Sequence, residues 1–421
     1  MASQRLVLLF NIEFRGAMPI QVVLLGAGAS KSYDRSPLGE RMPLARDFFE
    51  TFNRLRLAAN PWVLIDKLCG YIIEIKNADP YTYLSSGIDI EELHSEIGDY
   101  VETNKGDFLK QFVARGAYTQ LVFIFATVIN EIQNGPISPV HRRIAKCLSD
   151  RDSIITFNWD TLMDRALSET GWSVDTGYGI APHAIFRDGW SDPITKNGSA
   201  IKIHKLHGST NWLTGYPLNL DNQILLGHAL DPGSVFVYEW SEHPYDTYDG
   251  RYMGGYEPFS YGYYPPNLMD VPGIPAKEGH SFVQVTPHFS WSPRGASGQR
   301  GIVSMPLIIP PVKEKSYELF GSLFKSIWNQ AEEDLVNADH IAIIGYSFPR
   351  TDDRSNELFR QSFARRTTIP VVSIVNPDPE HVANKFLLEF GIPQSNIRIF
   401  RDCLTENFPV EELLADEKFG K

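Results

Sequence analysis

Cysteine is scarce in this sequence and forms no recognisable pattern. Only three cysteines occur among 421 residues, at Cys69, Cys147 and Cys403, and no CxxC pair is present. Structural zinc sites are usually built from closely spaced cysteine pairs, so we expect no zinc and assign no metal ligands. Scattered cysteines also argue against a disulfide framework, which fits a reducing cytosol and predicts a cytoplasmic protein.

Basic residues are outnumbered by acidic ones. Lys and Arg together number 39 against 51 Asp and Glu, which gives a formal net charge of −12. Sequence-independent binding of nucleic acids depends on Lys and Arg contacts to phosphates. We therefore expect no direct nucleic-acid binding, and a local basic groove is the alternative left open.

Long hydrophobic runs are also missing. The run "LVLLF" at residues 6–10 is too short to span a bilayer and lacks a clean small-residue cleavage site, so we expect no membrane association. We interpret residues 1–19 as an N-terminal extension, with Met18 as an alternative to Met1 for the native start. A hydrophobic fraction of 43% at this length predicts one large domain with elaborations, or two domains.

The sequence does contain short apolar runs that alternate with helical patterns. Residues 43–150 have apolar positions at helical spacing over most of their length, whereas residues 228–301 are rich in Gly, Pro and Tyr and show no period. Strands are predicted within 20–30, 152–160, 199–209, 304–311, 340–352, 370–378 and 396–402, the last as an edge strand. This alternation indicates an α/β fold with a doubly wound parallel sheet.

Polar residues of interest follow the predicted strands. Ligands of doubly wound sheets bind beyond the carboxyl ends of the strands. The residues that the pattern places there are Ser30, Asn158, His207, Ser347 and Asn376. Their common position at one edge of the sheet is a stronger indication of a site than any one motif.

The first of these positions belongs to "GAGAS". Gly26 and Gly28 match the first two glycines of a dinucleotide-binding loop, and Lys31 stands where the third would be. Two glycines at a strand-to-helix turn let backbone N–H groups approach a pyrophosphate. The alternative is a tight structural turn.

Two further stretches carry an amide and an imidazole. "TFNWD" presents Asn158 and Asp160, which alternation sends to one side of the strand, and "KLHGS" presents His207 before a glycine that permits a sharp turn. A helix-capping asparagine and a core histidine are the structural alternatives. His204, deeper in the same strand, competes with His207 and is ranked lower.

The late strands end in "GYSFPRTD" and "NPD". These give Gly345 and Ser347, then Asn376 and Asp378, which in a dinucleotide site would meet the adenosine. Turn chemistry is the alternative for each. The acids of "DIEELH", residues 89–94, are most simply the solvated start of a helix.

Taken in order, "GAGAS", "TFNWD", "KLHGS" and "GYSFPRTD" resemble the motifs of the sirtuin-like NAD-binding domain of bacteria, and in particular the divergent branch that cleaves NAD in antiviral defence. The resemblance covers residues 20 to about 405 and accounts poorly for 228–301. It implies a Rossmann-like domain at 20–42 and 151–405, with an inserted helical module at 43–150. From composition and position we add a Gly/Pro/Tyr-rich insertion at 228–301 and a C-terminal tail at 406–421.

The resemblance also implies roles for single residues. The catalytic amide and imidazole of the family fall on Asn158 and His207. The binding residues that it implies are Gly26, Ala27, Gly28, Ala29 and Ser30 in the glycine loop, with Gly345, Ser347, Asn376 and Asp378 on the adenosine side. Deacylase sirtuins carry a four-cysteine zinc ribbon that is absent here, and they usually place an aliphatic residue where Trp159 stands. Both departures favour NAD cleavage over deacylation.

Breaking the nicotinamide–ribose bond is glycoside chemistry with an oxocarbenium-like centre. Nicotinamide is already cationic in NAD and leaves without a proton, so no general acid is needed. Our hypothesis is that Asn158 fixes a water or the ribose hydroxyls, that His207 withdraws a proton, and that Asp160 orients the loop or supports the positive charge.

Other functions stay open at this point. An NAD-dependent protein deacylase or an ADP-ribosyl transferase would use the same substrate, and a non-catalytic NAD or ADP-ribose-binding subunit would hold a partner in a ring. The resemblance implies a homo-oligomer and suggests a partner ATPase, such as a HerA-type DNA translocase.

Overall fold

A computed structural model of the chain describes residues 19–55, 62, 65–104, 106–133, 135–187, 190–194, 201–217, 235–239, 302–309, 321–349 and 353–414. Most of the predicted N-terminal extension and most of the 228–301 insertion lie outside these residues, as do residues 415–421.

The centre of the structure is a six-stranded parallel sheet with the strand order β11-β10-β9-β1-β2-β5. Its strands are β1 (Gln21–Leu25), β2 (Ser153–Thr156), β5 (Lys202–Lys205), β9 (His340–Ile344), β10 (Val371–Val375) and β11 (Ile397–Phe400). The strands β1, β2 and β9 are buried along their whole length, as expected for apolar runs covered on both faces. The predicted α/β fold with a doubly wound parallel sheet is confirmed.

Helices flank this sheet in two groups. One group contains α7 (Pro139–Cys147) and α8 (Leu162–Ser168), which pack on each other, with α12 (Val410–Leu414) against α7. The other contains α9 (Gly321–Asn337), α10 (Asp353–Arg365) and α11 (Glu380–Leu388); the short 3-10 helix η4 (Gln394–Asn396) leads into β11. The chain winds one way from β1 to β5 and the other way from β9 to β11, so the strand order reverses between β1 and β9. In such folds ligands bind at this switch point.

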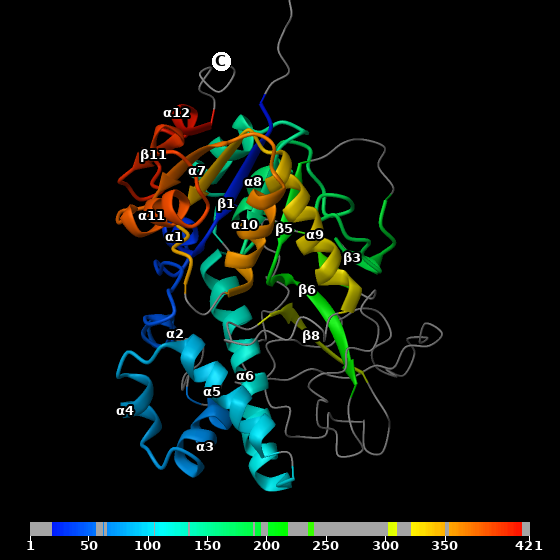
Figure 1. Cartoon of the computed structure of the whole chain (residues 1–421). Helices are drawn as coiled ribbons and strands as arrows, with labels where there is room; N and C mark the ends of the chain where they lie inside the picture. The colour runs from blue at the N-terminus through cyan, green and yellow to red at the C-terminus, as the bar shows by residue number, and fades with distance from the viewer. Residues whose placement is uncertain are drawn as a thin grey trace, which may run out of the picture.

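A group of helices lies beyond the carboxyl edge of the sheet (Figure 1). It contains α2 (Phe48–Leu55), α3 (Asp66–Glu74), α4 (Pro80–Leu84), α5 (Ile90–Thr103) and α6 (Phe108–Gln133), and α6 packs against both α3 and α5. Asp79 and Asp89 cap α4 and α5 by accepting backbone N–H groups of the first turn. The domain boundaries stay a prediction, and α7 packs with the sheet helices rather than with α6.

Among the residues that the structure describes, one helix, α6, is long and apolar enough to span a membrane. Residues Leu109–Gln133 are long and apolar enough to cross a bilayer, but 80% of the apolar window is buried inside the protein. A buried core helix passes the same test, so this helix is weak evidence for a membrane.

A second sheet was not predicted. Its strand order is β4-β3-β7-β6-β8, formed by β4 (Trp190–Ser191), β3 (Ala184–Phe186), β7 (Phe236–Tyr238), β6 (Gly208–Pro217) and β8 (Ile302–Ile308). The single strand predicted at 199–209 is wrong, because the chain turns at residues 206–207 and leaves the parallel sheet to begin β6. Likewise, β8 joins this second sheet, and β7 is a strand within the insertion in which no period is visible.

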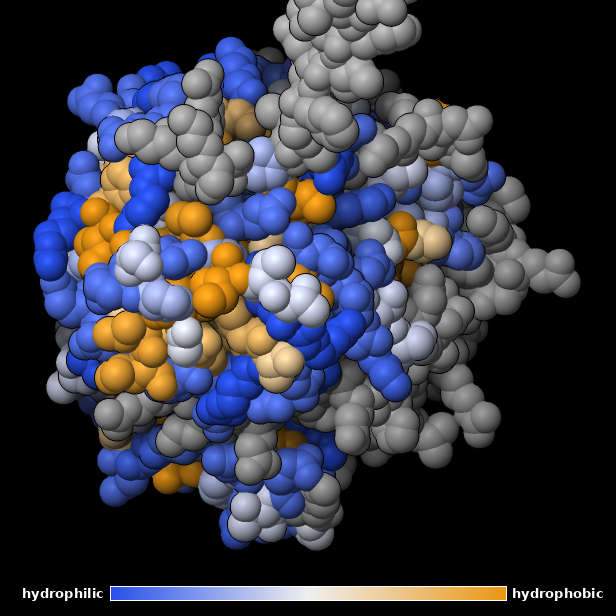
Figure 2. All heavy atoms as spheres, turned by 45° about the horizontal axis from the view of Figure 1, so that its top comes forward, coloured by the Kyte–Doolittle hydropathy of each residue, from blue (hydrophilic) through white to orange (hydrophobic). Residues whose placement is uncertain are grey.

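The outer surface is mixed in polarity. Figure 2 shows a mostly hydrophilic face with apolar side chains gathered in its left half. Leu109 and Leu388 are the most exposed large apolar side chains among the described residues, at 74% and 77%. Exposed apolar residues are ordinary on folded chains, and we assign them no function.

Candidate functional site

A cavity of about 430 Å³ lies between the carboxyl edge of the sheet and the helices beyond it. The sheet side is lined by Ala27, Ser30, Phe157, Asn158, Trp159, Asp160, His207, Gly345, Tyr346, Ser347 and Pro349. The facing wall is lined by Met42, Pro43, Leu44, Ala45, Phe48, Asp89, Ile90, Glu91, Glu92, Phe125 and Ile129. The volume is in the range of small-molecule sites, and the place is the switch point of the sheet.

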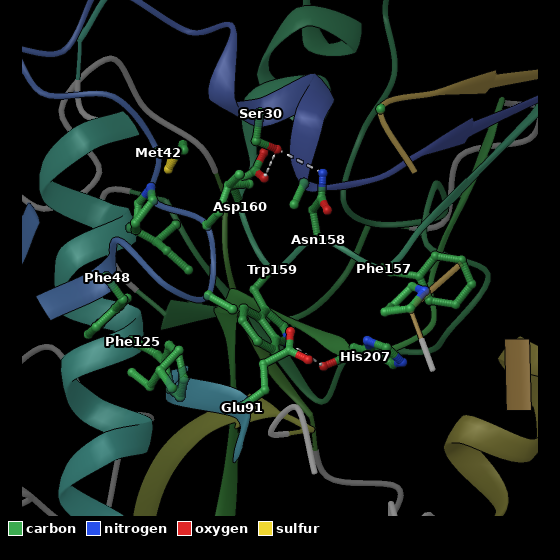
Figure 3. Close-up of a pocket in the computed structure, with 18 of the residues that line it drawn as sticks. Ser30, Met42, Phe48, Glu91, Phe125, Phe157, Asn158, Trp159, Asp160 and His207 are labelled. Atoms are coloured by element: carbon green, nitrogen blue, oxygen red, sulfur yellow. Dashed lines mark hydrogen bonds between the residues drawn. The ribbon is translucent and has the colours of Figure 1, made fainter. Parts of the chain in front are cut away.

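Three polar side chains form a hydrogen-bonded group at one end of this cavity (Figure 3). The Nδ2 of Asn158 donates to Ser30 Oγ at 2.7 Å and to the Gly26 carbonyl at 2.8 Å. Ser30 Oγ in turn donates to Asp160 Oδ2 at 2.6 Å. The loops after β1 and β2 are thus joined through side chains predicted to bind or to act on the ligand.

The loop that carries Asn158 and Asp160 is held by its own sequence. The backbone N–H of Asn158 donates to Thr156 Oγ1 at 3.0 Å, and Asp160 Oδ1 accepts the N–H of Leu162 at 3.0 Å in the first turn of α8. A third contact comes from α6, where Gln133 Oε1 accepts the N–H of Thr161 at 2.7 Å. Asn158 and Asp160 therefore reach the same cavity from a fixed backbone. Strand alternation is not the reason, because β2 ends at Thr156 and the intervening Trp159 lines the cavity too.

His207 lies in the two-residue turn between β5 and β6 and is only 5% exposed. Its carbonyl accepts Trp159 Nε1 at 3.1 Å and the N–H of Ile309 at 2.8 Å, while its ring packs edge-on against Phe157 with centroids 5.1 Å apart. Gly208 follows with a φ of 80°, in the left-handed region that favours glycine. These contacts place the imidazole in the cavity wall with Asn158.

His204 points elsewhere. Its Nε2 contacts Asp334 Oδ2 on α9 at 2.6 Å, and the residue does not line the cavity. The ranking of His207 above His204 therefore agrees with the geometry.

The backbone N–H groups of the two glycines in the first loop already donate hydrogen bonds within the protein. The N–H of Gly28 donates to the Gly345 carbonyl at 2.9 Å, and that of Gly26 donates to the Ile344 carbonyl at 3.0 Å. The following helix, α1 (Ala27–Lys31), has only five residues. The expected approach of these two amides to a pyrophosphate is not what the structure offers, because the last residue of β9 and the glycine that follows it already accept their hydrogen bonds. Of the loop, Ala27 and Ser30 line the cavity, whereas Gly26, Gly28 and Ala29 lie behind it.

The late strands contribute unequally. Gly345 and Ser347 line the cavity. Asn376 and Asp378 do not: the Asn376 side chain accepts the N–H of Asp378 at 3.0 Å in a partly exposed turn after β10. Asn376 and Asp378 thus lie outside the cavity in which we expected them to meet adenosine. Their hydrogen bond is that of a turn, which is the structural alternative considered from the sequence.

Sequence reasoning missed the wall opposite the sheet. Asp89, Glu91 and Glu92 line the cavity instead of only starting a solvated helix, and the half-buried Glu91 side chain points into it (Figure 3). Asp89 accepts the N–H groups of Glu91 at 2.9 Å and Glu92 at 3.4 Å, which fixes the start of α5. A capped helix start with acids has the same sequence pattern whether it faces water or a ligand, so no local signal marks Glu91.

The charged side chains in the described lining of the cavity are all acidic, and one of them, Asp89, is also paired with Arg46 at 3.6 Å. The described lining holds Asp89, Glu91, Glu92 and Asp160 but neither Lys nor Arg. Such a wall favours a ligand whose enclosed part is cationic and disfavours an enclosed phosphate. Within the described part of the chain, no group of three His, Cys, Asp or Glu side chains could hold a metal ion.

Comparisons with known proteins find no matching family model and no matching curated protein. Solved structures of sirtuins do match. A Sir2 homologue in complex with ADP-ribose is 13% identical with a TM-score of 0.35, over 94% of this chain and 90% of that one. A Sir2 complex with a p53 peptide and NAD+ is 11% identical with a TM-score of 0.31, over 92% and 89%. These identities and TM-scores are low, so the fold of this chain is assigned from the strand order of its own sheet.

Proposed function

We propose that this protein hydrolyses NAD at the nicotinamide–ribose bond, giving nicotinamide and ADP-ribose. The observation that carries the proposal is the convergence of Ser30, Asn158, Asp160 and His207 on one cavity at the switch point of the sheet. These residues come from three separate sequence motifs, and all four are among those for which the sequence predicts binding or catalysis.

The charge of the cavity suits this substrate. In NAD the pyridinium ring is cationic, and positive charge moves to the ribose as the bond to nicotinamide breaks. The acids of the described lining favour both charges. Nicotinamide departs neutral with the bonding electron pair, water adds to the anomeric carbon, and one proton is released.

Two side chains have direct roles in this proposal. Asn158 Nδ2 is held by Ser30 and Gly26, and its carbonyl oxygen points away from Ser30 (Figure 3). That oxygen can accept a hydrogen bond from the attacking water or from a ribose hydroxyl. His207 accepts the proton, a general-base contribution of about 10²- to 10⁴-fold.

One orientation of the dinucleotide agrees with the acidic lining of this cavity. The nicotinamide riboside end enters the cavity, and the remainder runs outward past Gly345 and Ser347. The phosphates then stay outside the acidic wall. The same orientation keeps the phosphates away from Gly26 and Gly28, whose N–H groups already donate to the carbonyls of Ile344 and Gly345.

The experiment is NAD turnover by the purified chain, followed by chromatography of nicotinamide and ADP-ribose. Asn158→Ala and His207→Ala should each lower kcat at least 100-fold with unchanged thermal unfolding, because each removes a group at the reacting centre. His381→Ala is the matched control, since His381 is exposed on α11. Full turnover by either site variant would exclude the assigned roles.

The same assay separates the alternatives. Nicotinamide release only with an acyl-lysine peptide would identify a deacylase, and ADP-ribose attached to protein would identify a transferase. Tight NAD binding without turnover would identify a sensing subunit.

We also propose that the activity depletes NAD in antiviral defence, in a homo-oligomer with a HerA-type ATPase partner. This extension is supported by the motif resemblance. It predicts a fall in cellular NAD during phage infection that the Asn158→Ala variant lacks.

A further inference from the structure

A fully buried ion pair lies next to the candidate site. Lys205 Nζ is 3.1 Å from Asp164 Oδ2, and the two side chains are 0% and 2% exposed. Lys205 ends β5 two residues before His207, and Asp164 lies on α8 four residues after Asp160. Burying two charges costs desolvation free energy that often equals or exceeds their attraction, so stability alone is a weak reason for such a pair.

The pair belongs to a network that reaches both catalytic loops. Lys205 Nζ also donates to the backbone carbonyl of Asp160. On its other side, Asp164 accepts the hydroxyl of Tyr178, which accepts Asn211 Nδ2 at 3.0 Å from β6. The network therefore connects the loop after β2 with both strands that flank His207.

Backbone contacts join the same two loops directly. The N–H of Leu206 donates to the Thr156 carbonyl at 3.0 Å, and the N–H of Thr210 donates to the Trp159 carbonyl at 2.9 Å. Asn158 lies between those two carbonyls in the chain, and His207 lies between the two donors. The Lys205 ammonium donates to the carbonyl of Asp160, the residue that follows Trp159 in the first of these loops.

We propose that Lys205 is a positioning residue for the reaction, which sets Asn158 and Asp160 relative to His207 through the Asp160 carbonyl; this inference rests on the proposed function. Lys205 does not line the cavity. Its effect is on geometry: a compact cation with three donors can hold a carbonyl and a carboxylate at once, which an apolar side chain cannot.

The decisive variant is Lys205→Met combined with Asp164→Asn. Lys205→Met alone leaves an unpaired buried carboxylate, and unfolding of the protein is its expected result. The double variant removes both charges and keeps an acceptor for Tyr178, so its thermal midpoint should recover toward that of the wild type. We expect its kcat for NAD to stay lower by about 100-fold, with KM changed by less than about threefold, because a misplacement of about 1 Å acts mainly on the chemical step.

The matched control is Arg187→Met with Asp175→Asn. That pair joins at 2.7 Å with Asp175 almost fully buried, and neither residue lines the cavity. Its removal should leave kcat unchanged. A double variant at Lys205 and Asp164 that folds and has the kcat of the wild type would overturn the proposal, because the pair would then serve folding alone.

The two proposals fail in different ways. If the wild-type chain turns over NAD and Asn158→Ala does not, the proposed function stands and the kcat of the double variant decides the role of Lys205. If the wild-type chain does not turn over NAD, the proposed function fails, and a crystal structure of the double variant decides. Displacement of the Asp160 carbonyl by about 1 Å supports the positioning role, and an unmoved loop excludes it.

Discussion

Replacing Gly26 by alanine should damage the site, although Gly26 itself does not line the cavity. A Cβ at this position would lie 2.5 Å from Tyr346 Cα and 2.6 Å from the Gly345 carbonyl oxygen. Both are backbone groups of the loop after β9, so no side chain can rotate away. Ordinary contact begins at 3.4 Å, and the loops after β1 and β9 must therefore separate by about 0.9 Å.

The expected magnitude follows from this separation. Overpacking of this kind typically costs about 1–3 kcal/mol of stability. The movement also separates two parts of the sheet-side wall of the cavity, since Ser30 follows β1 whereas Gly345 and Ser347 follow β9. A displacement near 1 Å can lower activity by about 100-fold, so we expect Gly26→Ala to lose about two orders of magnitude in kcat/KM for NAD.

A graded series tests this reasoning by NAD turnover and urea unfolding. Gly28→Ala should be milder, because its nearest contact would be Gly345 Cα at 2.9 Å. Gly70→Ala is the control: Gly70 is inside helix α3, a Cβ there meets nothing within 4 Å, and alanine should stabilise the helix by about 0.5–1 kcal/mol. If Gly26→Ala is as active and as stable as Gly70→Ala, the contact between the two loops does not shape the site.

Two further predictions concern the acidic wall and the response to pH. Glu91→Gln should lower kcat/KM for NAD by about tenfold, because it removes one negative charge from a cavity wall whose described residues include no Lys or Arg. Glu92→Gln, at an exposed neighbour, should have a much smaller effect in the same turnover assay, and equal effects would contradict a specific role for Glu91. Burial lowers the pKa of His94 from 6.5 to about 3. The unfolded chain therefore takes up the proton first as the pH falls below 6.5, and stability is lost progressively down to about pH 3, by about 2 kcal/mol at pH 5. The free energy of unfolding, measured with urea, should fall by about 2 kcal/mol less between pH 7 and pH 5 in His94→Phe than in the wild type. His381→Gln should show the wild-type loss. An unchanged pH dependence in His94→Phe would refute the assignment.

Much of the central sheet could be predicted because its signal is local. Strands such as β1 and β9 are short, apolar and buried on both faces, so their composition alone identifies them. The second sheet has no such signal. Its strands β3 and β7 are three residues long and pair with each other across about fifty residues of chain, and β6 begins where a strand of the first sheet was expected to continue.

The sequence by itself determined which polar residues stand at the carboxyl edge of the sheet, because parallel strands end on one side and Asn158 and His207 directly follow such strands. Only the tertiary structure decided that the Gly26 and Gly28 amides donate to Ile344 and Gly345, that Asn376 lies outside the cavity, that Glu91 lines it, and that Lys205 pairs with Asp164. The physical reason is that each of these outcomes depends on contacts between segments distant in the chain. A local pattern carries no information on which partner a buried amide, carboxylate or ammonium will meet.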